Sequence, residues 1–124
     1  MAKSILVIDD EELVAVSLKR LLKKEGYNVA VAGNGKEAID EVKESDFDLI
    51  ISDVRMPEMD GIEIIKQIRS CLEKSNKKPV PEILITGYAD SDKYEEALGL
   101  KVTEYLYKPF DNAELLRVVK KTIG

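Results

Sequence analysis

The sequence contains no histidine and has a single cysteine, Cys71. Without histidine, the chain has no histidine metal ligand, no Ser-His-Asp triad and no phosphohistidine of its own. One cysteine excludes an internal disulfide and fits a reducing, cytoplasmic location. If phosphoryl transfer from a histidine is part of the function, that histidine therefore belongs to another molecule.

Long apolar runs and excess positive charge are also missing. No apolar run approaches the roughly 20 residues that a membrane span needs. Residues 1–4 run directly into a strand-like segment, so we expect no signal peptide. The net charge of −5 argues against nucleic acid as the partner, because phosphate binding needs a basic face. At 124 residues, 44% apolar and 35% charged, residues 1–124 are expected to form one globular domain.

Apolar periodicity predicts five strands that alternate with five helices. The strand-like segments are residues 4–8, 28–32, 49–53, 82–86 and 104–107. Helical patterns follow each strand, and the weakest of them covers residues 90–98. This order predicts an α/β fold with one doubly wound parallel sheet and right-handed crossovers. The leading topology is flavodoxin-like, with strand order 2-1-3-4-5.

The stretch 48–61 is the centre of this organisation. Leu49, Ile50 and Ile51 form an unbroken apolar run, which suits a strand covered on both faces, and Asp53 stands at its end. Asp60 is then predicted to be the N-cap of the helix that follows. Taken alone, this stretch fits a solvated aspartate in a turn as well as it fits a functional carboxylate.

Polar residues at the ends of other strands favour the functional interpretation. Asp9, Asp10, Asp53, Thr86 and Lys108 all follow or end predicted strands, so a parallel sheet brings them to one rim. Each has a simpler explanation when taken singly: helix capping for the first two, β-branched strand packing for the threonine and an ordinary surface position for the lysine. Their convergence at the ends of four strands is the stronger evidence.

The chemistry of this rim predicts a divalent cation and a phosphoryl group. Three crowded carboxylates repel one another unless a cation lies among them. An oxygen-only set without histidine or cysteine suits a hard ion, and Mg²⁺ is the natural choice where phosphate is handled. Lys108 adds the compact positive charge of a phosphate-binding lysine.

The spaced set of residues resembles the receiver domain of two-component response regulators, over essentially all 124 residues. The segments that carry the resemblance are Asp9-Asp10-Glu11, Asp53 with Met56-Pro57 and Asp60-Gly61, Thr86-Gly87, and Tyr105 with Lys108-Pro109-Phe110. Taken together, these segments are very specific to that family.

The resemblance implies a role for each residue at the rim. Asp53 would be the phosphoacceptor, and Asp9 or Asp10 would bind Mg²⁺ together with Asp53, through side chains and water. Arg55 would contribute only its backbone carbonyl to the metal.

The same resemblance implies a switch. Lys108 would pair with the phosphoryl group, and Thr86 and Tyr105 would be the switch residues, which change the surface formed by residues 90–123. A cis peptide bond is implied between Lys108 and Pro109.

The implied partners are a histidine kinase or histidine phosphotransfer protein as donor, and a downstream effector domain or protein. The domain would assist its own phosphorylation and dephosphorylation without being an enzyme in the usual sense. Three positions depart from the habits of the family or influence phosphoryl lifetime in it. Lys101 stands where glycine is frequent, and Arg55 and Tyr88 lie two residues beyond the acceptor and the threonine.

Three other functions would place related chemistry on this type of fold. A magnesium phosphatase of the haloacid-dehalogenase type would need a second aspartate where Arg55 stands. A flavodoxin-like FMN carrier would need a glycine- and hydroxyl-rich loop after the first strand, where this chain has four acids, Asp9 to Glu12. The serious alternative is a protein-interaction module on the same fold that works without phosphorylation.

Overall fold

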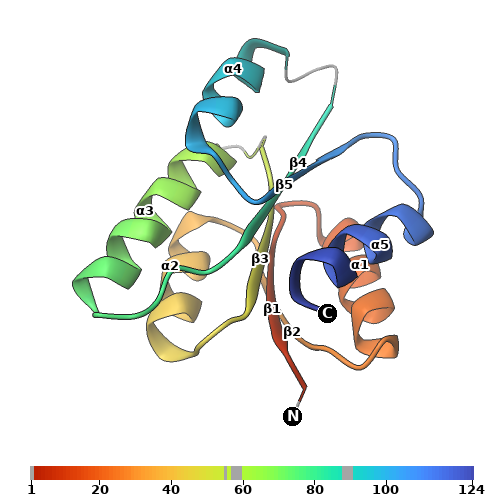
Figure 1. Cartoon of the computed structure of the whole chain (residues 1–124), viewed down its shortest axis with the longest axis horizontal. Coiled ribbons are helices and arrows are strands. Elements are labelled where there is room, and N and C mark those ends of the chain that lie inside the picture. The colour runs from red at the N-terminus through yellow and green to blue at the C-terminus, as the bar shows by residue number, and fades with distance from the viewer. Residues whose placement is uncertain (1, 55, 57–59, 88–90) are drawn as a thin grey trace.

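The computed structural model describes residues 2–54, 56, 60–87 and 91–124, with the backbone alone for residues 91–95. Strands and helices alternate: β1 (Ser4–Ile8), α1 (Glu12–Lys24), β2 (Asn28–Ala32), α2 (Gly35–Glu44), β3 (Leu49–Asp53), α3 (Gly61–Lys74), β4 (Glu82–Thr86), α4 (Ser91–Leu100), β5 (Glu104–Tyr107) and α5 (Asn112–Ile123). One sheet lies between two layers of helices, with α2, α3 and α4 on one face and α1 and α5 on the other (Figure 1).

The sheet has five parallel strands in the order β2-β1-β3-β4-β5, which confirms the predicted flavodoxin-like topology. Its central strand, β3, is buried at all five positions. Helices cover both faces of the sheet, and this explains the unbroken apolar run of that strand. Asp53 therefore ends a strand that neighbours support on both sides.

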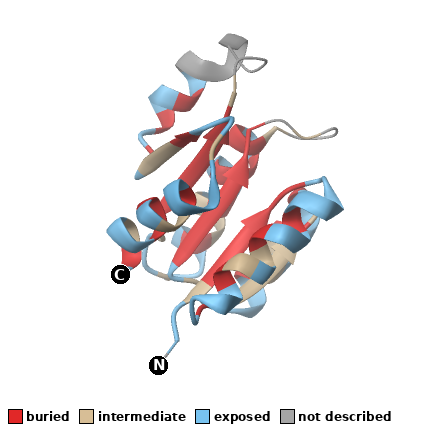
Figure 2. Cartoon of the chain, turned by 90° about the vertical axis from the view of Figure 1, so that its right-hand side faces the viewer, coloured by how far each residue is buried: buried red, intermediate tan, exposed pale blue. Residues whose placement is uncertain are grey.

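Alternation along the strands divides the apolar side chains into two cores. Leu6 and Ile50 pack in the core under α2, α3 and α4. Ile5, Leu49 and Ile51 pack in the core under α1 and α5. Figure 2 shows the buried sheet in the middle and exposed residues along the outer sides of the helices. Successive strand residues point to opposite faces, so each strand contributes to both cores.

Local capping fixes where three of the helices begin. The predicted N-cap Asp60 is confirmed, and Asn34 and Asp111 cap two further helices. The Glu63, Glu37 and Glu114 amides donate bonds of 2.8 Å to the Asp60, Asn34 and Asp111 side chains, respectively. Such caps satisfy amide groups that the first helical turn leaves without a partner. The helix expected over residues 90–98 spans Ser91–Leu100. Within the described parts of the chain, no helix combines the length and apolar character that crossing a membrane requires.

Lys101, at the position where the resemblance leads us to expect glycine, has a left-handed backbone with φ +54°. We expect Lys101→Gly to raise the free energy of unfolding by about 0.5–1 kcal/mol. Glycine removes a left-handed penalty of about 1–2 kcal/mol, and the greater freedom of glycine in the unfolded chain offsets part of that gain.

Asn76 provides the matched control, because it has nearly the same φ of +57°. Asparagine tolerates this conformation better than lysine does, so Asn76→Gly should gain less. Urea unfolding of both variants measures the difference. Equal gains, or no gain at residue 101, would show that the lysine backbone is not strained.

Candidate functional site

Three carboxylates meet at the carboxyl edge of the sheet. Asp9 follows β1, Asp10 is the next residue, and Asp53 ends β3, the strand paired with β1. One oxygen from each carboxylate lies within 4.8 Å of the other two. Asp9 and Asp53 are only 4% and 3% exposed, whereas Asp10 is exposed. The predicted convergence of these three residues is thus confirmed.

Helix capping does not account for the aspartate pair. The N-cap of α1 is Glu11, whose side chain makes no capping bond. Asp9 instead accepts a hydrogen bond of 2.9 Å from the Glu11 amide through Oδ1, which shapes the turn between strand and helix. This local bond orients the Asp9 carboxylate at the rim.

Burial dominates the electrostatics of Asp9 and raises its pKa from 3.8 to about 6. The negative charges of Asp53, Asp10 and Glu11 push the pKa in the same direction, while the hydrogen bond from the Glu11 amide opposes the rise. Burial and neighbouring negative charges make the ionised form of a carboxylate energetically unfavourable. A cation among these oxygens would stabilise the ionised carboxylates, and a set of oxygen ligands alone fits a hard ion such as Mg²⁺.

Lys108 brings a positive charge to the same acceptor. Its Nζ lies 3.1 Å from Asp53 Oδ2, and its side chain is 44% exposed while that of Asp53 is 4% exposed. The Lys108 amide also donates to the Thr86 carbonyl at 2.7 Å, which ties the loop after β5 to the end of β4. The peptide bond between Lys108 and Pro109 is cis, as the resemblance implied.

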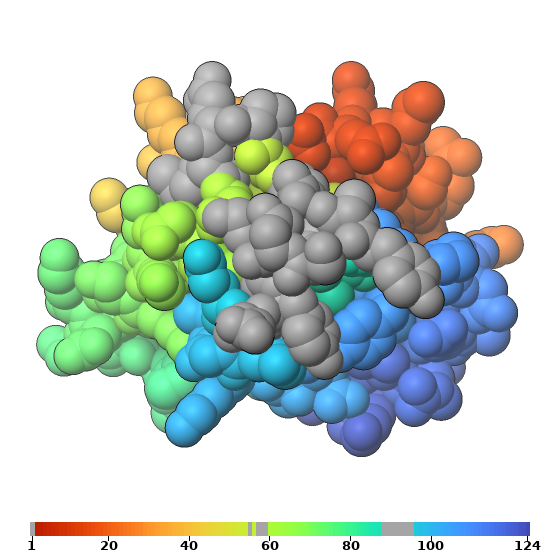
Figure 3. All heavy atoms as spheres, turned by 90° about the horizontal axis from the view of Figure 1, so that it is seen from above, coloured from red at the N-terminus to blue at the C-terminus, as the bar shows by residue number. Residues whose placement is uncertain are grey.

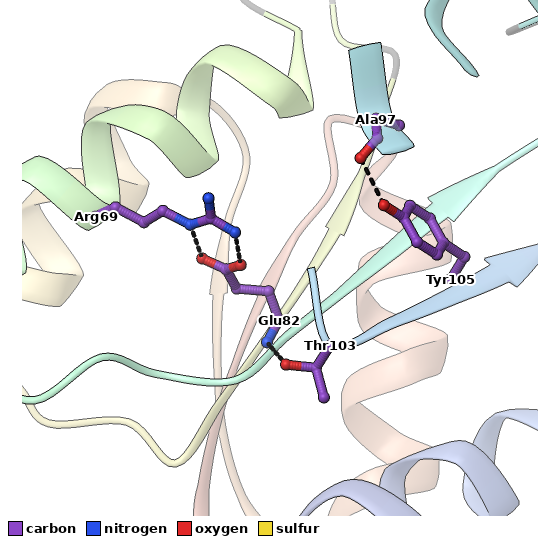
Figure 4. Close-up of polar contacts among 5 residues, drawn as sticks. All are labelled: Arg69, Glu82, Ala97, Thr103 and Tyr105. Atoms are coloured by element: carbon purple, nitrogen blue, oxygen red, sulfur yellow. Dashed lines mark hydrogen bonds and ion pairs between the residues drawn. The ribbon is translucent and has the colours of Figure 1, made fainter. Parts of the chain in front are cut away.

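The two expected switch residues occupy different places. Thr86 is the last residue of β4, is 2% exposed and lies one strand away from Asp53. Tyr105 is partly buried on β5, and its hydroxyl donates to the Ala97 carbonyl in α4 at 2.6 Å (Figure 4). The tyrosine therefore links β5 directly to α4. The sequence offered no signal for Ala97, because its backbone oxygen has no distinguishing residue type.

A second polar group, which the sequence did not predict, lies at the other end of β4. Arg69 of α3 binds the buried Glu82 with two contacts of 2.9 and 2.5 Å, and the Glu82 amide donates to the Thr103 hydroxyl at 3.2 Å (Figure 4). The only local signal was an acid at the first position of an otherwise apolar strand. This ion pair joins α3 to the sheet, far from the acidic rim.

The rim lies at the end of the molecule where the strands finish. Figure 3 looks onto this end, where the N-terminal part of the chain (red and orange), α3 (green) and the C-terminal third of the chain (blue) face the viewer. Arg55, expected to offer a carbonyl to the metal, and Tyr88 lie outside the described residues. Two surface hollows of about 390 and 1040 Å³ lie elsewhere, lined by residues such as Pro79 and Pro81.

Comparison with known proteins adds independent information. The family model for the response regulator receiver domain matches residues 5–120. The chain is 39% identical to the transcriptional regulatory protein ZraR of Escherichia coli K12, over 97% of the chain and 26% of that protein. It is 37% identical to the alkaline phosphatase synthesis transcriptional regulatory protein PhoP of Bacillus subtilis, over 97% of the chain and 48% of that protein.

Among solved structures, the chemotaxis protein CheY4 of Vibrio cholerae superimposes with a TM-score of 0.86 at 31% identity. That match covers 98% of this chain and 99% of CheY4. The chain thus spans about a quarter to a half of the two transcriptional regulators, but nearly the whole of the chemotaxis protein.

Proposed function

Because the chain belongs to the response regulator receiver family of two-component systems, we propose that Asp53 accepts a phosphoryl group from a histidine of another protein. The observation that carries the proposal is the setting of Asp53: a buried carboxylate with Lys108 Nζ at 3.1 Å and two further acids within 4.8 Å. Residues 1–124 would act as one receiver domain. A signalling role of this kind needs a phosphoacceptor, not an enzyme with turnover.

The donor set fits Mg²⁺, and two features of this chain support that choice. Among the described residues, the candidate side-chain ligands at the rim are all carboxylates, and burial already makes a negative charge on Asp9 unfavourable. We assign Asp9, Asp10 and Asp53 as the side chains that would hold the ion, with the backbone carbonyl of Arg55 as a further ligand. When bound, Mg²⁺ supplies positive charge close to the phosphoryl oxygens.

In the transfer step, a carboxylate oxygen of Asp53 forms a bond to phosphorus. The bond between that phosphorus and the imidazole nitrogen of the donor breaks, and the imidazole leaves with its electron pair. The Lys108 ammonium lies at the acceptor and offsets negative charge on the phosphoryl oxygens. Charge placement and alignment are thus the main contributions of the chain to the reaction.

Signalling would follow from the charge that arrives on Asp53, roughly −1.5 to −2 at neutral pH if it titrates like other phosphoryl groups. Thr86 can then donate a hydrogen bond worth about 1.5–3 kcal/mol. Inverting a 1:99 population needs about 5.5 kcal/mol, so Thr86 alone is too weak. The bias must come from Thr86, Lys108 and repacking of Tyr105 together. Tyr105 already contacts α4, which supports residues 90–123 as the output surface.

The proposed partners are a histidine kinase or histidine phosphotransfer protein upstream and an effector domain or protein downstream. A donor must reach the rim where α1 begins, and α1 exposes apolar side chains there: Leu13 is 84% exposed and Val16 is 42% exposed. Such residues suit a protein partner more than a small molecule. The cytoplasmic location predicted from the sequence stays a prediction.

The proposed function is tested by intact-mass measurement of the wild-type protein after incubation with Mg²⁺ and a small acyl phosphate. We expect the mass of one phosphoryl group to be added, and the addition to stop when a chelator removes Mg²⁺. A protein that gains no phosphoryl mass, yet still binds its effector, would instead support the interaction module that works without phosphorylation.

Thr86 and Lys108 should separate signalling from chemistry. Thr86→Ala is expected to accept the phosphoryl group at nearly the wild-type rate, because a neutral hydroxyl contributes little charge to the transfer. It should lose about 1.5–3 kcal/mol of the free energy that favours the active state. This loss lowers the ratio of active to inactive protein on the order of tenfold or more. Lys108→Ala should lose both the bias and part of the transfer rate, since its ammonium contacts Asp53.

NMR spectra before and after addition of beryllofluoride with Mg²⁺ measure the bias, and intact mass against time measures the rate. The signals to follow are those around Tyr105, which lies on a different strand from both Thr86 and Asp53. A full wild-type response in Thr86→Ala would mean that the threonine is ordinary strand packing.

A further inference from the structure

We infer that Gly61 is a positioning residue for Asp53, because a side chain at residue 61 has no room against the backbone of the acceptor. The inference rests on the proposed role of Asp53. Gly61 is the first residue of α3 and is buried, and its amide donates to the Val54 carbonyl at 2.7 Å. The start of α3 therefore lies directly against the end of β3.

The available space is less than any side chain needs. A Cβ atom on Gly61 would lie 2.0 Å from the Asp53 carbonyl oxygen, 2.9 Å from its carbonyl carbon and 3.0 Å from Val54 Cα. All three are backbone atoms, which cannot turn aside as the end of a flexible side chain can. Real Cβ contacts are essentially never shorter than 3.0 Å, so an alanine here must move the backbone by about 1 Å (3.0 Å less 2.0 Å).

Backbone conformation does not explain the glycine. The described glycines with left-handed φ are Gly26 and Gly124, and Gly61 is not among them. Alanine is also the better helix former, so the helix itself would favour a side chain at this position. The close approach to Asp53 is the remaining physical reason for a glycine.

The displacement would reach the reacting carboxylate. The Val54 amide donates to the Ile85 carbonyl at 3.0 Å, and β3 pairs with strands on both sides. These bonds hold the strand, so the clash is relieved by turning the Asp53 peptide group or by pushing α3 away. Mg²⁺ coordination at 2.0–2.1 Å tolerates little displacement, and a 1 Å error in alignment can cost about 10²-fold in rate.

The experiment compares Gly61→Ala with Gly33→Ala, in the loop after β2. A Cβ on Gly33 would meet only the Glu37 Oε1 atom, at 3.6 Å, which is an ordinary contact. We expect Gly61→Ala to be phosphorylated about 10- to 100-fold more slowly by an acyl phosphate, and to bind Mg²⁺ alone at least about tenfold more weakly in calorimetric titration. Gly33→Ala should match the wild type in both measurements.

A third variant separates positioning from loss of stability. Ile65→Val removes one methylene group from a fully buried position of α3, in the core under α2, α3 and α4, and leaves Gly61 unchanged. Equal losses of rate in Ile65→Val and Gly61→Ala would overturn the inference, as would unchanged Mg²⁺ binding in Gly61→Ala. If Gly61→Ala unfolds, the substitution is repeated in a protein that also carries the stabilising Lys101→Gly. If that double variant is unfolded too, Gly61 is needed only for folding and the inference is overturned.

The same experiment distinguishes this inference from the proposed function. A wild-type protein that gains no phosphoryl mass would refute the proposed function, yet the Mg²⁺ titrations of the wild type, Gly61→Ala and Gly33→Ala would still test Gly61. Normal phosphorylation of both glycine variants would refute only the inference.

Discussion

Asp53→Asn should gain no phosphoryl mass in the presence of Mg²⁺ and an acyl phosphate, whereas the wild type gains one phosphoryl group. The amide that replaces the carboxylate is a poor nucleophile, and it also removes one of three candidate metal ligands. Intact-mass measurement over time checks the result, and this is the largest effect that we expect of any substitution in the chain.

Asp40→Asn is the matched control, because it makes the same change of charge at an exposed position on α2. It should be phosphorylated as the wild type is. Equal labelling of Asp53→Asn and the wild type would place the acceptor elsewhere and refute the proposed function. Loss of labelling in both variants would mean that net charge, not the acceptor, controls the reaction.

The second large effect concerns Asp9 and pH in the absence of metal. The pKa of Asp9 rises from 3.8 to about 6 on folding, chiefly through burial. Between these pH values the folded chain holds more protons than the unfolded chain, so the free energy of unfolding falls as pH rises. At 1.36 kcal/mol per pH unit, the loss amounts to about 3 kcal/mol and is complete above about pH 6.

Asp9→Asn should remove this dependence and still accept the hydrogen bond from the Glu11 amide. With chelator present, we expect the variant to be more stable than the wild type by up to about 3 kcal/mol at pH 7.5, and nearly equal to it at pH 4. Urea unfolding at both pH values measures the difference, in which the other titrating groups cancel. A difference that does not change with pH would contradict the assignment.

Mg²⁺ should remove most of the difference in stability between the wild type and Asp9→Asn. At 100 times its Kd, a bound ion stabilises the wild type by about 2.7 kcal/mol through mass action. Asp9→Asn lacks one carboxylate and should gain much less, and Asp10→Asn should also show a weakened gain. If Mg²⁺ leaves the melting temperature of the wild type unchanged, the acidic rim is not a metal site.

Much of the site was predictable because parallel strands all end at one edge of the sheet. Once the apolar segments and the cap at Asp60 gave the order of strands and helices, the meeting of Asp9 and Asp53 followed from topology. The pairing of Lys108 with Asp53 is of the same kind. Identifying these residues as acceptor and lysine required the spaced set of motifs, not periodicity.

Contacts between layers were not predictable in this way. The bond from Tyr105 to the Ala97 carbonyl and the ion pair of Arg69 with Glu82 each join a helix to the strand that follows it in the chain. They depend on how far a helix stands from the sheet and on which rotamers fit between them. Apolar periodicity contains neither quantity, so the sequence predicted the elements but not these links.

Gly61 marks the boundary between the two kinds of information. The sequence by itself determined that a strand ends before residue 61 and that a helix begins there, because local capping and turn chemistry act over a few residues. Only the tertiary structure decided that this glycine lies against the Asp53 carbonyl and that Asp9 is buried enough to raise its pKa. Both depend on distances between packed segments, which are settled when the helices close over the sheet.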